Sequence, residues 1–209
     1  AYLAILGDGR GGVHCENSLD SFDNWSPKTI EDIQPGTFDN IVTNPPFGKK
    51  LSIDTTEILG LYDLGHKWTE QDGGFSKGEL MDKQPPQLLF IERCFQMLRD
   101  GGRMGIVLLE SIFGMPKYQY VVNYIQSKAK ILAVVTLPED LFQPHTHAKC
   151  CVLICQKYEK GETFETCSDY DVFMSDVKWC GHDSRGNVTY TVNENGEKVI
   201  LDEIPLVAD

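Results

Sequence analysis

Apolar residues along the chain fall into runs whose spacing predicts alternating strands and helices. The run 38–43 is rich in β-branched residues and predicts a strand. From Gln87 to Leu98, apolar residues recur at steps of three and four, which predicts a helix that Asp100–Gly102 ends. The continuous apolar run 104–109 predicts a buried strand of the kind found in parallel sheets covered on both faces.

The next part of the chain repeats this alternation. A second helix is expected over 117–128, where apolar residues share one face, and a strand over 131–137. The apolar run 150–155 follows too closely for a crossover helix, so it should pair antiparallel with 131–137. Together these runs predict an α/β fold with a partial doubly wound, Rossmann-like sheet and an antiparallel C-terminal strand pair.

Two stretches lack this regularity. Residues 1–6 are predicted to end an apolar helix, and Gly7–Gly12 formally matches Gly-x-Gly-x-x-Gly. A phosphate-binding loop needs a strand before the glycines and a helix after them, whereas a short β-like stretch at 13–15 follows here. A helix-ending glycine turn is therefore favoured, with the phosphate loop as the alternative. The segment 48–86 has mixed charges and little apolar periodicity, so a surface loop or flap is expected.

After Tyr158 the pattern changes to short alternating stretches. Residues 171–174 and 188–192 alternate like exposed strands on either side of a turn-rich segment, which predicts a β-hairpin appendage. We therefore expect two units, residues 1–158 as part of the α/β domain and residues 159–209 as a β-rich appendage.

The predicted strand 38–43 runs into the turn Asn44-Pro45-Pro46-Phe47. Each proline fixes its own φ and keeps the preceding residue extended, so a polar side chain, a carbonyl and an aromatic ring are held side by side. In an open α/β sheet, ligands bind beyond the carboxyl ends of the strands, which makes this turn a candidate site. The alternative is a strand-ending turn whose Phe47 packs into the core.

Charge and cysteine content narrow the choices. Acidic residues outnumber basic ones by 31 to 19, giving a formal net charge of −12, which is the wrong sign for gripping nucleic acid unaided. Seven cysteines without a Cys-x-x-Cys pair indicate reduced cytosolic thiols. With no visible membrane span or signal peptide, a cytoplasmic location is expected. The chain begins without Met inside an apolar run, so we expect a fragment of a longer protein.

One cluster of metal-ligand residue types occurs near 150. It contains His145, His147, Cys150 and Cys151. Their spacing lacks paired ligands and the cysteines open a buried strand, so no metal site is expected.

Several segments share the order of a known family. They are Asn17-Ser18-Leu19, 38–48, 87–109, 134–157 with its Leu-Pro-x-x-x-Phe stretch, and the tail around 172–174 and 181–183. This set resembles the adenine-N6 DNA methyltransferases, and more narrowly the methylation (M) subunit of type I restriction-modification systems. The resemblance implies an S-adenosylmethionine-dependent methyltransferase sheet, with residues 1–158 forming the C-terminal part of the catalytic domain.

The chemistry of this family accounts for the turn residues. An adenine amino group is a poor nucleophile, because its lone pair is delocalised into the ring. The Asn44 side-chain oxygen and the Pro45 carbonyl are suited to accept its two hydrogens, with Pro46 keeping the turn stiff. Phe47 would stack on a base that has left the duplex. The resemblance maps a second pocket aromatic to Phe142, for which a core position is the alternative.

The resemblance also implies a methyl-donor site. This chain differs from the family at that site in two ways. Asn17, Leu19 and Asn44 correspond to residues that contact S-adenosylmethionine. The family's glycine-rich donor loop lies upstream of residue 1, so the chain carries half of the donor site and we expect it to be inactive alone. Asn17 stands where family members commonly have Asp, and its amide can still bond an adenine edge.

The expected function is methyl transfer from S-adenosylmethionine to the N6 amino group of adenine in DNA. The implied partners are DNA, a DNA-specificity subunit and a restriction subunit, without a membrane. One alternative is an inactive assembly fragment that binds the specificity subunit, which the acidic charge favours. Another is methylation of a guanine amine in RNA or a protein glutamine, although the resemblance over 87–157 favours DNA.

Overall fold

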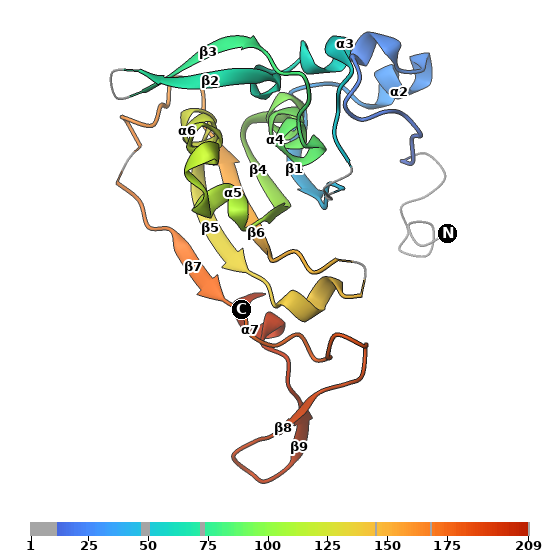
Figure 1. The fold of residues 1–209 in the computed structure, drawn as a ribbon, viewed down its shortest axis with the longest axis vertical. Coiled ribbons are helices and arrows are strands. Elements are labelled where there is room, and N and C mark those ends of the chain that lie inside the picture. Colours follow the sequence, from blue (N-terminus) through green and yellow to red (C-terminus); the bar gives the residue numbers. More distant parts are fainter. Residues whose placement is uncertain (1–11, 47–50, 72–73, 145, 168, 209) are drawn as a thin grey trace.

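The computed structural model describes residues 12–46, 51–71, 74–144, 146–167 and 169–208. Its centre is a five-stranded sheet of order β1-β4-β6-β5-β7 (Figure 1). The strands are β1 (Phe38–Thr43), β4 (Leu98–Leu109), β5 (Ala129–Thr136), β6 (Cys150–Lys157) and β7 (Phe173–Asp176).

The central sheet is mixed. Strand β1 is parallel to β4, with Thr43 opposite Ile106. Strand β6 lies between β4 and β5 and is antiparallel to both. The predicted antiparallel pair is therefore confirmed, while β4 has one parallel and one antiparallel neighbour.

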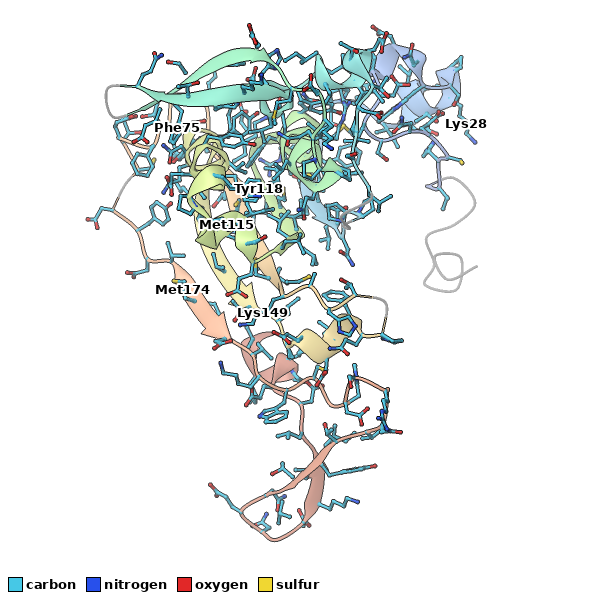
Figure 2. The ribbon with its side chains drawn as sticks, in the orientation of Figure 1. Lys28, Phe75, Met115, Tyr118, Lys149 and Met174 are labelled. Atoms are coloured by element: carbon cyan, nitrogen blue, oxygen red, sulfur yellow. The ribbon has the colours of Figure 1, made fainter. Side chains whose placement is uncertain are left out.

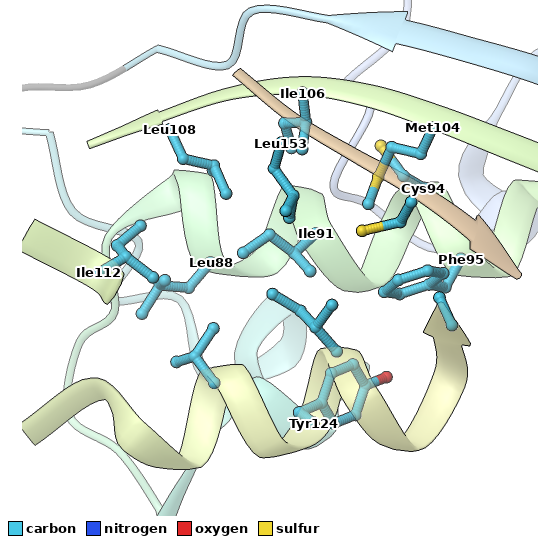
Figure 3. Packing of buried hydrophobic residues seen from close by; sticks show 14 of the residues in the cluster. Leu88, Ile91, Cys94, Phe95, Met104, Ile106, Leu108, Ile112, Tyr124 and Leu153 are labelled. Atoms are coloured by element: carbon cyan, nitrogen blue, oxygen red, sulfur yellow. The ribbon is translucent and has the colours of Figure 1, made fainter. Parts of the chain in front are cut away.

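Two helices precede the inner strands and carry the core, as predicted. Helix α4 (Pro86–Met97) leads into β4, and α6 (Gln119–Lys128) leads into β5. In Figure 3 the labelled side chains of α4, α6 and the sheet meet in one cluster, which includes Leu88, Ile91, Ile106, Leu108, Tyr124 and Leu153. Burying one aliphatic side chain of this kind contributes about 1.5–3 kcal/mol. Between β4 and α6 lie the short helices α5 (Ser111–Gly114) and η3 (Pro116–Tyr118).

The N-terminal part differs from its prediction. Residues 13–15 form no strand, and the following segment contains η1 (Phe22–Asn24) and α2 (Pro27–Asp32). Helix α2 begins there because the Ser26 hydroxyl accepts a hydrogen bond from the Thr29 N–H and proline occupies the first turn. The predicted helix end at 1–6 and residues 7–11 of the glycine turn lie outside the described residues.

The prediction of a surface loop over 48–86 is wrong for its described part. This segment forms α3 (Thr56–Leu59), η2 (Asp63–Gly65) and a hairpin of β2 (His66–Gln71) and β3 (Gly74–Leu80). Leu59, Tyr62 and Leu64 are almost fully buried. Periodicity missed them because they reach the core from short helical turns, where neither the helical nor the strand spacing is sustained.

A buried arginine joins this segment to the N-terminal part. Arg93 of α4 donates to the Tyr62 hydroxyl at 2.9 Å and to the Asp20 carbonyl at 2.6 Å. Its guanidinium lies 4.1 Å from the centre of the Phe22 ring. The Tyr62 hydroxyl in turn donates to the Leu19 carbonyl at 2.8 Å.

The C-terminal part contains a β-hairpin, but not the predicted one. Strand β7 pairs parallel with β5, so the expected pairing of 171–174 with 188–192 is wrong. The hairpin consists of β8 (Tyr190–Val192) and β9 (Lys198–Ile200), and it projects beyond the sheet in Figure 1. Helix α7 (Ile204–Ala208) follows it. A division of the chain at 158/159 stays a prediction.

No described helix is long and apolar enough to span a bilayer. The seven cysteines are free thiols.

Replacing Arg93 should loosen the contact between α4 and the N-terminal part. We expect Arg93→Leu to lower the free energy of unfolding by about 1.5–3 kcal/mol, because the Tyr62 hydroxyl and the Asp20 carbonyl lose a charged partner. Urea denaturation measures this. The control is Arg99→Leu, since Arg99 is half-exposed and its partners within the described part of the chain are Asp39 and the Asp100 carbonyl. Equal losses in the two variants would contradict a special role for Arg93.

Candidate functional site

The turn after β1 lies where three strand ends meet. Strands β1 and β4 are parallel, and β5 runs the same way because both β4 and β5 are antiparallel to β6. The carboxyl ends of these strands therefore share one edge of the sheet. Asn44 follows β1 directly and is exposed, while Pro45 behind it is buried. This is the crevice in which open α/β sheets bind ligands.

The predicted acceptor residues line one hollow at this edge, which we call the motif cavity. It has a volume of about 350 Å³, and its lining includes Asn44, Pro45, Pro46, Phe142 and Thr146. Phe142 comes from the 3-10 helix η4 (Glu139–Phe142) and also packs against the core cluster around Leu137. The two interpretations of Phe142, core and pocket, thus both describe its surroundings. Phe47 lies outside the described residues.

A second hollow adjoins the motif cavity and contains a residue that the sequence did not single out. This Gln87 cavity has a volume of about 600 Å³ and shares Pro46 and Thr146 with the motif cavity. Gln87, in the first turn of α4, is 4% exposed, and its Oε1 has no hydrogen-bond partner among the described residues. An unpaired buried acceptor costs about 1–3 kcal/mol, so the position of Gln87 against a cavity makes it a candidate ligand contact. In the sequence, Gln87 could have been recognised as a polar residue at the start of an otherwise apolar helix.

The predicted donor-site residues form a tight turn. The Asn17 Oδ1 accepts from the Leu19 N–H at 3.1 Å. The Leu19 side chain is buried in a cluster with Tyr62, and its carbonyl accepts from the Tyr62 hydroxyl. Leu19 therefore holds the turn in place through its contacts with Tyr62.

Ser18 lines a third hollow, the Ser18 cavity. It has a volume of about 280 Å³ and is bounded on the other side by Thr43 and Phe90. The cavity is lined by the residue after Asn17 and the residue before Asn44, while Asn17, Leu19 and Asn44 themselves are not part of its lining.

The cysteines and histidines near 150 form no metal-ligand group of three or more with neighbouring acids among the described residues. Cys150 and Cys151 are buried at the start of β6, and burial raises the pKa of the Cys151 thiol to about 12. His147 lines the Gln87 cavity, and His145 is outside the described residues.

The fold and these cavities define an open α/β protein with a candidate ligand site at the carboxyl ends of its strands. The sequence model of the N-6 DNA methylase family matches residues 12–200, and the chain belongs to this family. No curated protein matches the chain. The family resemblance and the α/β methyltransferase fold expected from the sequence are thus confirmed, whereas the roles of individual residues stay predictions.

Several solved structures are similar to this chain in fold. A modification subunit attributed to a type I restriction enzyme from Vibrio vulnificus matches with a TM-score of 0.54 and 15% identity, covering 96% of this chain and 43% of that one. The type I restriction enzyme EcoKI M protein matches with a TM-score of 0.47 and 18% identity, covering 83% of this chain and 31% of that one. A protein described as a class I S-adenosylmethionine-dependent methyltransferase from Listeria monocytogenes matches with a TM-score of 0.48 and 20% identity. The match covers 66% of this chain and 36% of that one. The chain therefore spans less than half the length of each.

Gln87 should behave differently from its buried neighbour Gln84. Gln87→Leu removes an unpaired acceptor, so we expect the free energy of unfolding to stay level or rise. Gln84→Leu should lower it by about 1–3 kcal/mol, because Gln84 Nε2 donates to the Leu64 carbonyl and the Tyr120 hydroxyl. Thermal or urea denaturation of both variants checks this, and equal losses would mean that Gln87 has a protein partner.

Proposed function

We propose that this chain is part of an adenine-specific DNA methyltransferase, the modification subunit of a type I restriction-modification complex. It transfers a methyl group from S-adenosylmethionine to the N6 amino group of adenine. The observation that carries the proposal is the motif cavity, where Asn44, Pro45 and Phe142 line one hollow at the carboxyl edge of the sheet. Membership of the N-6 DNA methylase family supports the same reaction.

The target amine is held by two acceptors. The Asn44 side-chain oxygen and the Pro45 carbonyl accept its two hydrogens, which favours the pyramidal nitrogen with a localised lone pair. These acceptors also stabilise the positive charge that develops on N6 during transfer. Because Pro45 is buried and Pro46 follows it, the acceptors are fixed before the substrate arrives. S-adenosylmethionine supplies the electrophilic methyl group when bound.

The target base must leave the duplex to enter the motif cavity. Unstacking costs a few kcal/mol, and an aromatic platform returns about 1–3 kcal/mol. Phe142 lines the cavity and can provide one such face. Phe47 remains the predicted second face. The neighbouring Gln87 amide then offers a buried polar group to the bound nucleotide.

S-adenosylmethionine is assigned to the side of the sheet that carries the Ser18 cavity. Asn17, Leu19 and Asn44 remain the proposed cofactor-binding residues. Asn17 uses its side-chain oxygen within the turn, so its amide nitrogen is the atom that would donate to the adenine edge of the donor. Leu19 keeps the turn in register through Tyr62.

The acidic net charge of −12 supports a complex in which another subunit holds the DNA duplex. The DNA-specificity subunit holds the duplex, this chain acts on the adenine, and a restriction subunit completes the assembly in the cytoplasm.

A second candidate function is an assembly module that contacts the specificity subunit. It is favoured by the hairpin β8–β9, where Tyr190, Val192 and Ile200 are about half or more exposed. Large exposed apolar side chains on a projecting hairpin are typical of protein contacts. Methylation of an RNA guanine or a protein glutamine is less well supported, because the matching family is one of DNA methylases.

Asn44→Ala should reduce methyl transfer at least about a hundredfold, as loss of one preorganised partner of a developing charge commonly does. The assay measures transfer of labelled methyl from S-adenosylmethionine to adenine in duplex DNA by the full-length protein with its partner subunit. Asn40→Ala is the matched control, because Asn40 is an exposed asparagine on β1, the strand that leads into Asn44. Full activity of Asn44→Ala would refute the assigned role.

Gln87→Leu should lower the same activity at least about tenfold while leaving the protein as stable as before. A loss of activity with preserved stability separates a substrate contact from a structural one. Unchanged transfer would remove Gln87 from the site.

A further inference from the structure

A groove outside the three cavities lies between the β2–β3 hairpin and the start of α6. It has a volume of about 500 Å³, and its lining includes Lys67, Trp68, Lys83, Lys117, Tyr118 and Tyr120. We call it the hairpin groove. In Figure 1 the hairpin runs across α6, and Figure 2 shows Tyr118 beside that helix.

The aromatic wall of the hairpin groove is held rigidly. Trp68 and Tyr120 are stacked, with ring centroids 6.4 Å apart and ring planes 14° from parallel. The Trp68 indole donates to the Asp63 carbonyl at 3.1 Å. The Tyr120 hydroxyl accepts from the buried Gln84 amide at 3.2 Å. The rings are therefore ordered before any ligand binds.

The groove carries positive charge in a chain that is strongly acidic overall. Lys83 and Lys117 are exposed and form no ion pair with the described residues, and the Lys117 ammonium lies 4.6 Å from the centre of the Tyr118 ring. Lys67 approaches Glu79 at 3.8 Å, but both side chains are mostly exposed and such a pair is weak. No acidic side chain lines the described part of the groove.

The groove is continuous with the candidate active site. It shares Leu51, Pro85 and Tyr118 with the Gln87 cavity. That cavity shares Pro46 and Thr146 with the motif cavity. A strand whose base occupies the motif cavity can therefore extend along one connected surface to the lysines.

We propose that the hairpin groove binds the DNA strand next to the target adenine, with Lys83 and Lys117 on phosphates and a neighbouring base against Tyr118. Cations that follow a backbone beside aromatic faces are what single-stranded nucleic acid requires. This site rests on the proposed function, because it takes the adenine strand as its ligand. It supplies local grip on the unpaired strand, which the acidic remainder of the chain lacks.

The test measures binding of a short fluorescent single-stranded DNA oligonucleotide to the full-length protein assembled with its specificity subunit. The double variant Lys83→Gln/Lys117→Gln should bind about tenfold more weakly. The slope of log K against log salt should become shallower by about 1.4, or about 0.7 for each lost phosphate contact. Lys83→Arg/Lys117→Arg should retain binding, because it keeps both charges.

The matched control is Lys28→Gln/Lys160→Gln, which removes the same charge at exposed positions outside the groove, with Lys28 on α2 away from Tyr118 (Figure 2). Equal affinity and equal slope for the groove variant and the wild-type protein would overturn the proposal. So would an equal effect in the control, which would mean a delocalised charge effect. Much tighter binding of an RNA oligonucleotide of the same sequence would also overturn it in favour of an RNA site.

Methyl transfer separates this proposal from the proposed function. If the groove variant loses oligonucleotide binding while the wild-type protein transfers no methyl group to adenine, the result supports DNA binding in the groove and refutes the proposed reaction. If the wild-type protein methylates adenine and the groove variant has the same KM for DNA, the reaction stands and the groove falls. The expected result is a raised KM for DNA with little change in kcat or in the KM for S-adenosylmethionine.

Discussion

The arrangement of the site depends on one buried cation, Arg93. Its hydrogen-bond partners among the described residues are neutral, the Tyr62 hydroxyl and the Asp20 carbonyl, with the Phe22 ring over its guanidinium. Burial raises the pKa of Tyr62 to about 12, so this hydroxyl stays protonated and donates a hydrogen bond to the Leu19 carbonyl. Three chain segments far apart in sequence are joined through these contacts. The turn that carries Asn17 is thereby held against α4, although it belongs to no sheet.

Helix α4 distributes several such constraints along its length. Gln87 in its first turn faces a cavity, and Arg93 near its end holds the N-terminal part. Between them, Glu92 accepts hydrogen bonds from the Asp63 and Leu64 N–H groups, both at 2.9 Å. Burial raises the pKa of Glu92, while these two backbone donors act in the opposite direction. One helix thus positions the candidate site, the turn that carries Asn17 and the segment that leads to the hairpin.

The sequence predicted the periodic part of this fold well. The strand 38–43 and the helices over 87–98 and 117–128 were recognisable, because each is packed on a continuous face whose spacing is visible in the chain. The antiparallel order of 131–137 and 150–155 followed from the short connection. The convergence of Asn44, Pro45 and Phe142 was also expected, although through the family resemblance and not from spacing.

The missed features share a physical cause, which is that their stability comes from contacts between distant segments. Tyr62 is buried because Arg93 and Leu19 meet its hydroxyl, and nothing near residue 62 announces either partner. The pairing of β7 with β5 likewise depends on an open sheet edge, whereas local alternation predicted a hairpin partner.

The same physical cause explains why the hairpin groove could not be predicted from the sequence. Trp68 comes from β2, Lys83 from the connection between β3 and α4, and Lys117 from η3, and each alone looks like a solvated or packed side chain. Their common orientation arises only because the β2–β3 hairpin packs on α6 through the Trp68–Tyr120 stack. The β2–β3 hairpin, for which the sequence predicted a loop, therefore brings residues from separate segments into one basic and aromatic surface. That surface adjoins the cavities at the carboxyl edge of the sheet, so under the proposed function the hairpin and the Asn-Pro-Pro turn would contact the same DNA strand.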